Sequence, residues 1–331
     1  MRIATFLPHV GVFGGVRRFL ELGNEWVALG HTVTLYHPEG TPPAWLEYHG
    51  RVAPLPQAAT ESSDVAIGAD PHTYAAFRAH TAPVHLYYCV IEGDPGLELA
   101  MPDPGVTLAA NSHALIDQVA RRARRHVLDG VGGIRLSHFH PAPMERAVAP
   151  LRVLVNGRRS RAKKGTDLVL RALAGLNGRV PEFEIVLFDS VDAHNRQDPR
   201  DGAPLPPNAR FVIGPSQAEL AKLYQSSHVF VAAERKAGWC NTALEALASG
   251  CALVCTRSGT RDFAVHEHNA LVAWRHQWFI RGAVKRLLTD EALRLRLSAT
   301  APASAEPWAW PALARKLLSQ IEAPAAQRVG R

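Results

Sequence analysis

Cysteine is scarce in this sequence, whose 331 residues include only Cys89, Cys240, Cys251 and Cys255. These four are scattered and have no His or Cys partners at the spacing of zinc ligands, which argues against a disulfide framework and a metal site. No stretch approaches the roughly 20 apolar residues of a membrane-spanning helix, and the first residues lack the layout of a signal peptide. We therefore expect a soluble, cytoplasmic protein without a metal or other cofactor.

An acidic excess is also missing. Lys and Arg total 37 against 30 Asp and Glu, a formal net charge of +7. This balance suits phosphates, nucleic acid or acidic membranes, and a coding bias toward Arg explains it equally well. The basic run at 121–125 has no interleaved aromatic residues and fits a solvated helix end. We expect no nucleic-acid partner; contact with a membrane surface stays open without support, as does the oligomeric state.

Short apolar runs alternate with amphipathic segments of helical length along almost the whole chain, as is typical of parallel sheets with crossover helices. The apolar runs contain few polar residues, which indicates strands covered on both faces. We expect strands at 2–8, 31–38, 64–70, 84–91, 106–111, 151–157, 183–189, 209–214, 228–234 and 269–274. The segment 216–225 opens with a capping box from Ser216 to Glu219.

The alternation breaks at 139–151, which contains three prolines and no periodicity, so we expect the domain linker there. The predicted fold class is α/β, with two doubly wound parallel-sheet domains facing a central cleft. The domains are expected at 1–143 and 144–305, followed by a C-terminal helix within 306–331 that crosses back to the first domain. The last nine residues read as disordered.

Three places could bind a phosphorylated ligand. Gly14 and Gly15 follow the first strand and open a helix, where free N–H groups favour anions, although a plain tight turn explains them equally well. The sequence lacks the G-x-G-x-x-G pattern of a conventional NAD site. Arg158 follows a strand and Lys164 precedes a helix, so both cations could neutralise a diphosphate, whereas most charge runs are solvated loops.

The third place is the segment AGWCNTALEALASGCALVCT at 237–256, which reads as a loop, a helix and a buried strand. Asn241 and Thr242 lie where a helix N-terminus offers unpaired N–H donors, and Gly238 permits close approach. Glu245 shares a helix face with Asn241 and could accept two hydrogen bonds from ribose hydroxyls, although an exposed Glu is the plainer reading. Downstream, Asp262 could bind a sugar hydroxyl or cap a helix.

Six segments in order resemble the family-4 glycosyltransferases, retaining enzymes of the GT-B fold that use nucleotide sugars. They are FGGVRRFLELGNEWVALGHTVTL, GGIRLSHFHP, GRRSRAKKGTDLVLRAL, VIGPSQAELAKLYQSSHVFV, GWCNTALEALASGCALV and SGTRDFAVHEHNALV. The fifth resembles the family's E-x7-E motif. The resemblance implies a nucleotide sugar as the donor substrate, an N-terminal acceptor domain and a C-terminal donor domain.

The resemblance also implies a role for individual residues. Arg158 and Lys164 would bind the donor diphosphate as the catalytic cations, and Glu245 would bind the ribose. The backbone at Asn241 and Thr242 would add donors to the phosphates. The remaining donor-binding positions would be Gly14, Gly15, Gly214 and Gly238.

The sequence departs from the family in two places. The family's first Glu falls on Ala237, so Glu234, three residues earlier, would contact the donor sugar only in a rearranged loop. A deoxysugar donor would fit an alanine there. The family's N-G-I-D reads G-G-I-R, with Gly132 and Arg135 at the altered positions.

The expected reaction transfers a sugar to an acceptor hydroxyl of unknown class, with retention and without a side-chain nucleophile or a metal. The acceptor-binding residues are unknown and are expected in N-terminal loops such as 91–99. A catalytically degenerate nucleotide-sugar-binding or scaffold protein is the alternative, supported by Ala237. An epimerase would need acid and base carboxylates that the sequence does not place.

Overall fold

The computed structural model describes residues 1–142, 149–190, 198, 200–201 and 203–329. The chain divides into two compact units. Unit 1 comprises Met1–Gly133 and Trp308–Arg331, and unit 2 comprises Ile134–Pro307. Residues 143–148 of the proline-rich linker expected at 139–151 lie outside the described residues, and residues 134–142 group with unit 2.

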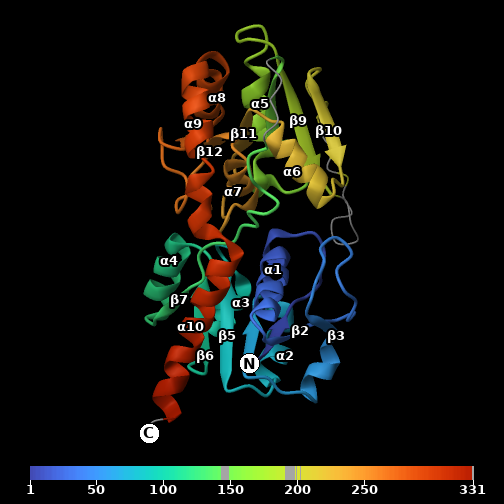
Figure 1. The fold of residues 1–331 in the computed structure, drawn as a ribbon, viewed down its shortest axis with the longest axis vertical. Helices are drawn as coiled ribbons and strands as arrows, with labels where there is room; N and C mark the ends of the chain where they lie inside the picture. The colour runs from blue at the N-terminus through green and yellow to red at the C-terminus, as the bar shows by residue number, and fades with distance from the viewer. Residues whose placement is uncertain (143–148, 191–197, 199, 202, 330–331) are drawn as a thin grey trace. The chain divides into compact units, whose positions relative to one another are not determined.

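Unit 1 contains a seven-stranded parallel sheet in the order β3-β2-β1-β4-β5-β6-β7 (Figure 1). Its strands are β1 (Arg2–Phe6), β2 (Thr32–His37), β3 (Arg51–Pro54), β4 (Val65–Gly68), β5 (Val84–Cys89), β6 (Val106–Ala110) and β7 (Val127–Asp129). Its α-helices are α1 (Gly14–Ala28), α2 (Tyr74–Ala79), α3 (Pro95–Ala100), α4 (His113–Ala123) and α10 (Trp310–Val329). Short 3-10 helices η1 (Leu55–Ala59) and η2 (Pro71–Thr73) join them.

Side chains that alternate along these strands form two separate cores. Ile3 and Leu35 pack with residues of α1 and α10, among them Trp26 and Leu317. On the opposite face, the core residues come from the strands and from α2, α3 and α4. Because both faces are covered, the strands are almost continuously apolar, as the sequence predicts.

Helix α10 returns to unit 1 through both polar and apolar contacts. The Nζ of Lys316 donates to Asp129 Oδ1 at 2.8 Å and to the carbonyl of Val131 at 2.9 Å. The helix reaches Val329 and so covers most of the segment from residue 323 for which we predicted disorder; residues 330–331 lie outside the described residues.

A buried arginine of helix α1 binds the loop that follows β7. Arg18 is 2% exposed, and its guanidinium donates to the Tyr88 hydroxyl at 2.9 Å and to the carbonyls of Gly130 and Gly132 at 3.1 and 2.7 Å. It also lies 5.4 Å from the centre of the Trp310 ring. These contacts satisfy a charge that would be costly to bury without partners.

Unit 2 contains a six-stranded parallel sheet in the order β10-β9-β8-β11-β12-β13 (Figure 1). Its strands are β8 (Leu151–Asn156), β9 (Phe183–Asp189), β10 (Ala209–Ile213), β11 (Val229–Ala232), β12 (Ala252–Cys255) and β13 (Ala270–Val272). Its helices are η3 (Ala162–Lys164), α5 (Thr166–Ala174), α6 (Gln217–Gln225), α7 (Asn241–Ala248), α8 (Gln277–Thr289), α9 (Glu291–Thr300) and η4 (Ala303–Trp308), the last of which ends in unit 1.

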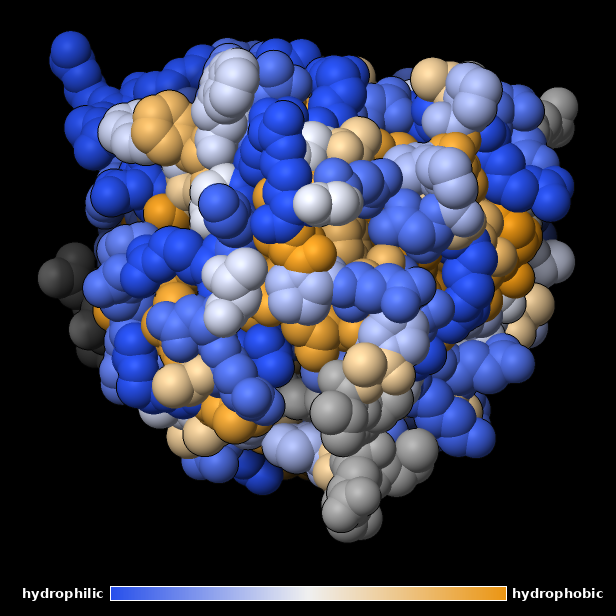
Figure 2. Space-filling view, turned by 90° about the horizontal axis from the view of Figure 1, so that it is seen from above, coloured by the Kyte–Doolittle hydropathy of each residue, from blue (hydrophilic) through white to orange (hydrophobic). Residues whose placement is uncertain are grey.

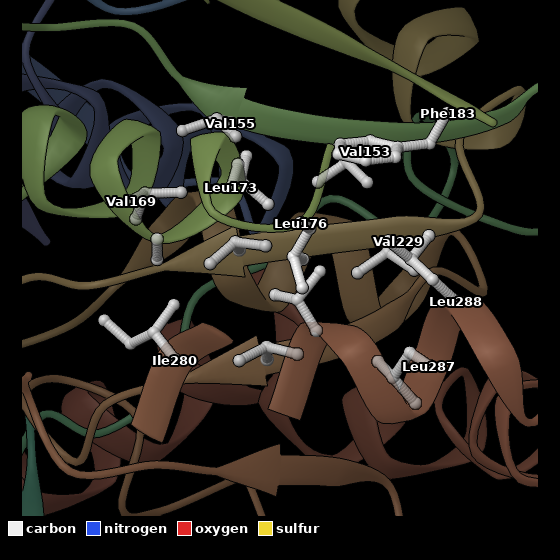
Figure 3. Close-up of a cluster of buried hydrophobic side chains, with 14 of the residues drawn as sticks. Val153, Val155, Val169, Leu173, Leu176, Phe183, Val229, Ile280, Leu287 and Leu288 are labelled. Carbon is white, nitrogen blue, oxygen red and sulfur yellow. The ribbon is translucent and has the colours of Figure 1, made fainter. Parts of the chain in front are cut away.

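Aliphatic side chains dominate one core of unit 2. Val153 and Val229 of the sheet pack with Leu173 of α5 and with Ile280 and Leu287 of α8, and Figure 3 shows these side chains between the strands and the helices. Helices α6 and α7 lie on the other face, where Tyr224 packs edge-on against Phe188 and Phe230. Both faces of this sheet are therefore also covered.

The sequence located most of these elements, and the capping box at the start of α6 is confirmed, because Ser216 and Glu219 each accept the other's backbone N–H. It missed six short elements of unit 1: β3, β7, α2, α3, η1 and η2. The basic run at 121–125 ends α4, where Arg125 donates to three backbone carbonyls.

The surface of the molecule is mostly hydrophilic on the face shown in Figure 2, where hydrophobic residues form small areas among polar ones. None of the helices that the structure describes has the length and hydropathy of a membrane-spanning segment. The four cysteines are buried and carry free thiols.

Candidate functional site

The candidate site lies at the carboxyl end of the sheet in unit 2. Strand β8 pairs with β9 on one side and with β11 on the other, so the chain changes direction across the sheet between β8 and β11. In open parallel sheets, ligands bind at such a switch point because the loops that follow the two strands separate there. The loop after β8 carries Arg158 and Lys164, and the loop after β11 carries Glu234.

Arg158 follows β8 and is 8% exposed. Its Nε lies 3.0 and 3.1 Å from the two carboxylate oxygens of Asp189, and its Nη2 lies 2.7 Å from Oδ1. The same guanidinium donates to the Ser190 hydroxyl at 3.3 Å. Asp189 ends β9, so the sheet itself places this carboxylate beside the arginine, and much of the cation's hydrogen-bonding capacity is used within the protein.

Lys164 ends the short helix η3, and its Nζ donates to Glu234 Oε1 at 2.8 Å. The side chains are 25% and 8% exposed, so the pair is largely withdrawn from water. Burial acts to lower the pKa of Lys164, but the opposing effects of Glu234 and Cys240 are larger and the pKa is raised. The lysine is therefore a protonated cation at neutral pH.

Backbone contacts hold the two loops together. Gly165 has a φ of +76°, and a Cβ there would lie 2.3 Å from the carbonyl oxygen of Ala233. The N–H of Arg235 donates to the carbonyl of Lys163 at 2.9 Å. From the segment after β13, Arg275 donates to Ala233 O at 2.8 Å. The Lys164–Glu234 pair is thus fixed by the chain around it.

Helix α7 starts at the same carboxyl end of the sheet. Cys240 occupies the N-cap position without a side-chain cap hydrogen bond, and its own N–H donates to the carbonyl of Gly259 at 2.8 Å. Asn241 and Thr242, both half-buried, are the first residues of the helix. The first N–H groups of a helix have no carbonyl partner within the helix and carry a partial positive charge. An anion near Asn241 would meet these donors.

Glu245 lies one turn into α7 and is 3% exposed. Its Oε2 accepts a hydrogen bond from the Tyr224 hydroxyl at 2.9 Å. Burial and the adjacent carboxylate raise the pKa of Tyr224 well above its usual value, so the phenol stays protonated and donates. Phe139 and Phe188 pack edge-on against the tyrosine ring. The carboxylate is therefore oriented by a rigid aromatic cluster.

The other predicted site residues are distributed as follows. Gly238 is buried in the loop before α7, and Asp262 is half-buried in a turn after β12. Gly214 follows β10 with a φ of +62°, and its N–H donates to the carbonyl of Asp189 at 2.7 Å. Gly14 and Gly15 start α1 and so belong to the other unit. Six of the predicted residues therefore lie together at the carboxyl end of the sheet in unit 2. They are Arg158, Lys164, Glu234, Asn241, Thr242 and Glu245.

Two residues of this site escaped the sequence analysis. Asp189 ends an apolar strand, FEIVLFD, and an acidic residue at a strand's carboxyl end is a signal that could have been used. Tyr224 is an ordinary-looking apolar position of an amphipathic helix, and nothing in the sequence marks its hydroxyl. Among the described residues, no three His, Cys, Asp or Glu side chains are placed to hold a metal ion.

Part of the chain matches a known protein family. Residues 146–304 match the family model described as glycosyl transferases group 1, a segment that includes Arg158, Lys164 and Glu245. No curated protein sequence matches the chain.

Several solved structures share the fold. The sucrose-phosphate synthase of Thermosynechococcus elongatus superimposes with a TM-score of 0.80 at 16% identity, covering 98% of this chain and 99% of that one. A glycosyltransferase of Rickettsia africae gives 0.72 at 14% identity, covering 97% of each. Anabaena HepE in complex with UDP and glucose gives 0.78 at 13% identity, covering 97% and 99%. The fold is therefore GT-B.

Proposed function

We propose that this protein is a retaining glycosyltransferase that moves a sugar from a nucleoside diphosphate to an acceptor hydroxyl. The match to group 1 glycosyltransferases over unit 2 supports the activity, and the GT-B fold agrees with it. The observation that carries the proposal is the gathering of two cations and a helix N-terminus at the switch point between β8 and β11. Two cations and a helix N-terminus at a switch point suit the binding of a diphosphate.

In this proposal the diphosphate binds near Lys164 and the first N–H groups of α7. As the bond to the sugar breaks, negative charge grows on the leaving diphosphate, and these fixed positive groups stabilise it. Glu245, oriented by Tyr224, binds the ribose hydroxyls. The leaving phosphate accepts the acceptor's proton on the same face of the sugar, so no side-chain nucleophile is needed.

The resting ion pairs shape how this site would work. Lys164 is neutralised by Glu234 and Arg158 by Asp189. A diphosphate that reaches Lys164 competes with Glu234 for the ammonium or joins it as a second acceptor, since an ammonium has three N–H donors. Arg158 acts in this scheme by fixing the loop after β8 against Asp189 and by adding its positive charge to the site.

A second function has support from one position. Ala237 stands where the resembling family has a carboxylate toward the donor sugar, and the nearby Glu234 is already bound to Lys164. A nucleotide-sugar-binding protein without turnover would tolerate this arrangement. The two functions share nucleotide binding and differ in catalysis.

Two measurements test these functions. Thermal denaturation with UDP, GDP and ADP should show that one nucleotide raises the melting temperature, and Glu245→Ala should remove that shift. A full shift in the variant contradicts the ribose role. Incubation with nucleotide sugars should then release free sugar slowly from the matching donor, as expected of a transferase without its acceptor. Nucleotide binding without release from any donor favours the non-catalytic function.

A further inference from the structure

Three large aromatic side chains are exposed where β13 leads into α8. Trp274, Trp278 and Phe279 are 74%, 63% and 56% exposed, whereas Ile280 beside them is 1% exposed and belongs to the core. Helix α8 thus packs one face, which includes Ile280, into the core, while Trp278 and Phe279 on its other side are exposed to solvent. Apolar side chains of this size are usually buried, and their clustering on a surface marks a contact with something else.

Exposed cations lie beside Trp274 in the chain and on the two loops that Arg275 contacts. Arg275 lies between Trp274 and α8 and donates to Ala233 O at 2.8 Å and to Ala162 O at 3.4 Å. Those two bonds bring together the segments on either side of the candidate site. Five exposed basic side chains lie near the candidate site in these three segments, and Lys285 and Arg286 lie further along α8. The five are Arg161, Lys163, Arg235, Lys236 and Arg275.

Carboxylates hardly offset this charge. Within residues 157–166, 233–239 and 273–289, which the structure describes fully, the only acidic residue is Glu234. It is 7% exposed and paired with Lys164, so it contributes little negative charge to the surface. Outside these ranges, Asp167 pairs with Arg159 and Glu267 with Arg286, and none of the five exposed cations forms an ion pair with a described residue. The aromatic rings therefore belong to a surface of net positive charge at the carboxyl end of the sheet.

We propose that this basic aromatic surface, made of Trp274, Trp278, Phe279 and the five exposed cations near the candidate site, docks on an anionic lipid membrane. The inference goes beyond the proposed function and does not depend on it. Indole rings favour the interface between water and lipid, phenyl rings add apolar area, and Lys and Arg are attracted to anionic headgroups. Docking here would bring the candidate site next to the bilayer.

A single-stranded nucleic acid is a weaker match to the same surface. Such ligands need ring faces on which bases stack. The Arg281 guanidinium lies over the Trp278 ring, 5.1 Å from its centre, and covers a ring face on which a base would stack. The structure thus favours insertion of ring edges into lipid over stacking of bases.

The test is cosedimentation of the full chain with vesicles of phosphatidylcholine alone and of phosphatidylcholine mixed with phosphatidylglycerol. We expect binding to the mixed vesicles, weakened by salt, and little binding to the neutral ones. Trp278→Ser/Phe279→Ser and Arg235→Glu/Lys236→Glu should each weaken binding at least about tenfold. Leu295→Ser, which changes a residue that is 58% exposed on α9, and Arg121→Glu on α4 should bind as the wild type does.

Three results would overturn the inference: no preference for anionic vesicles, equal loss in the control variants, or unchanged binding in both surface variants. Binding of an RNA oligonucleotide or self-association that the same substitutions abolish, without vesicle binding, would also overturn it. A cooperative thermal transition without ligand, measured on every variant, shows that each is folded. Nucleotide-dependent thermal shifts are measured in addition. They also separate the two proposals, since a chain that binds vesicles and no nucleotide contradicts only the proposed function.

Discussion

Glu234 lies 2.8 Å from Lys164 and supplies a carboxylate to the loop after β11, three residues before Ala237. In the family that the sequence resembles, the acidic residue of this loop stands at the position of Ala237. The carboxylate is therefore present in the loop but is bound to the neighbouring cation. This relationship makes the pair the first target for substitution.

Lys164→Met should lower the free energy of unfolding by about 3 kcal/mol, because it leaves the buried Glu234 carboxylate without its partner. The double variant Lys164→Met/Glu234→Gln should recover at least about 1 kcal/mol of that loss. Urea unfolding of the wild type, both single variants and the double variant measures the coupling. Arg122→Met breaks the exposed pair with Glu98 and should cost less than about 1 kcal/mol. Strict additivity at Lys164 and Glu234 would contradict the pair's importance.

Tyr224→Phe should destabilise the protein by about 1–2 kcal/mol, because Glu245 loses a donor in a buried environment. The stabilising effect of the matching nucleotide should fall as well, since the carboxylate is no longer held toward the ribose. Denaturation with and without nucleotide measures both effects. Tyr74→Phe is the matched control, because its hydroxyl bonds the carbonyl of Leu99 at an exposed position. If Tyr224→Phe lowers the stability of the protein but leaves the stabilisation by nucleotide unchanged, the tyrosine is structural and does not orient the carboxylate for the ligand.

The sequence predicted the fold well because the parallel strands are nearly uninterrupted apolar runs and the helices between them have strong periodicity. Short elements such as β3 (Arg51–Pro54) and β7 (Val127–Asp129) were missed. Strands of three or four residues at a sheet edge carry too little pattern to separate them from loops. Their formation depends on the neighbouring strand, which only the folded chain provides.

The candidate site was predicted in part. The positions of Arg158 and Lys164 relative to strand and helix ends follow from local sequence, and the structure places both at one sheet edge. That each is already paired with a carboxylate could not be predicted, because Asp189 and Glu234 come from other strands. The exposure of Trp274 and Trp278 was equally hidden, since a tryptophan near an amphipathic helix is usually part of the core.

The buried His85 should make unit 1 less stable in mild acid. Burial and the nearby Arg78 lower the pKa of His85 below its usual value of 6.5, while the carbonyl of His80 and the carboxylate of Asp103 oppose this. The unfolded chain therefore takes up this proton first, and the contribution of His85 to stability is lost as pH falls from about 7 through the folded-state pKa. His85→Gln should flatten the pH dependence of unfolding in that range, and His268→Gln, an exposed histidine, should leave it unchanged. A steeper dependence in His85→Gln would reverse the assigned sign.

Alanine substitutions at Gly133 and Gly30 compare the cost of steric overlap with the cost of backbone strain. Both have positive φ angles, +120° and +85°. A Cβ at Gly133 would lie 2.2 Å from the Trp310 ring, whereas nothing lies within 4 Å of one at Gly30. Gly30→Ala should therefore cost about 1 kcal/mol from the backbone alone. Gly133→Ala should cost at least about 3 kcal/mol, because Trp310 is buried and must move with α10. Equal losses in urea unfolding would mean that the ring yields freely and that α10 is not anchored at this glycine.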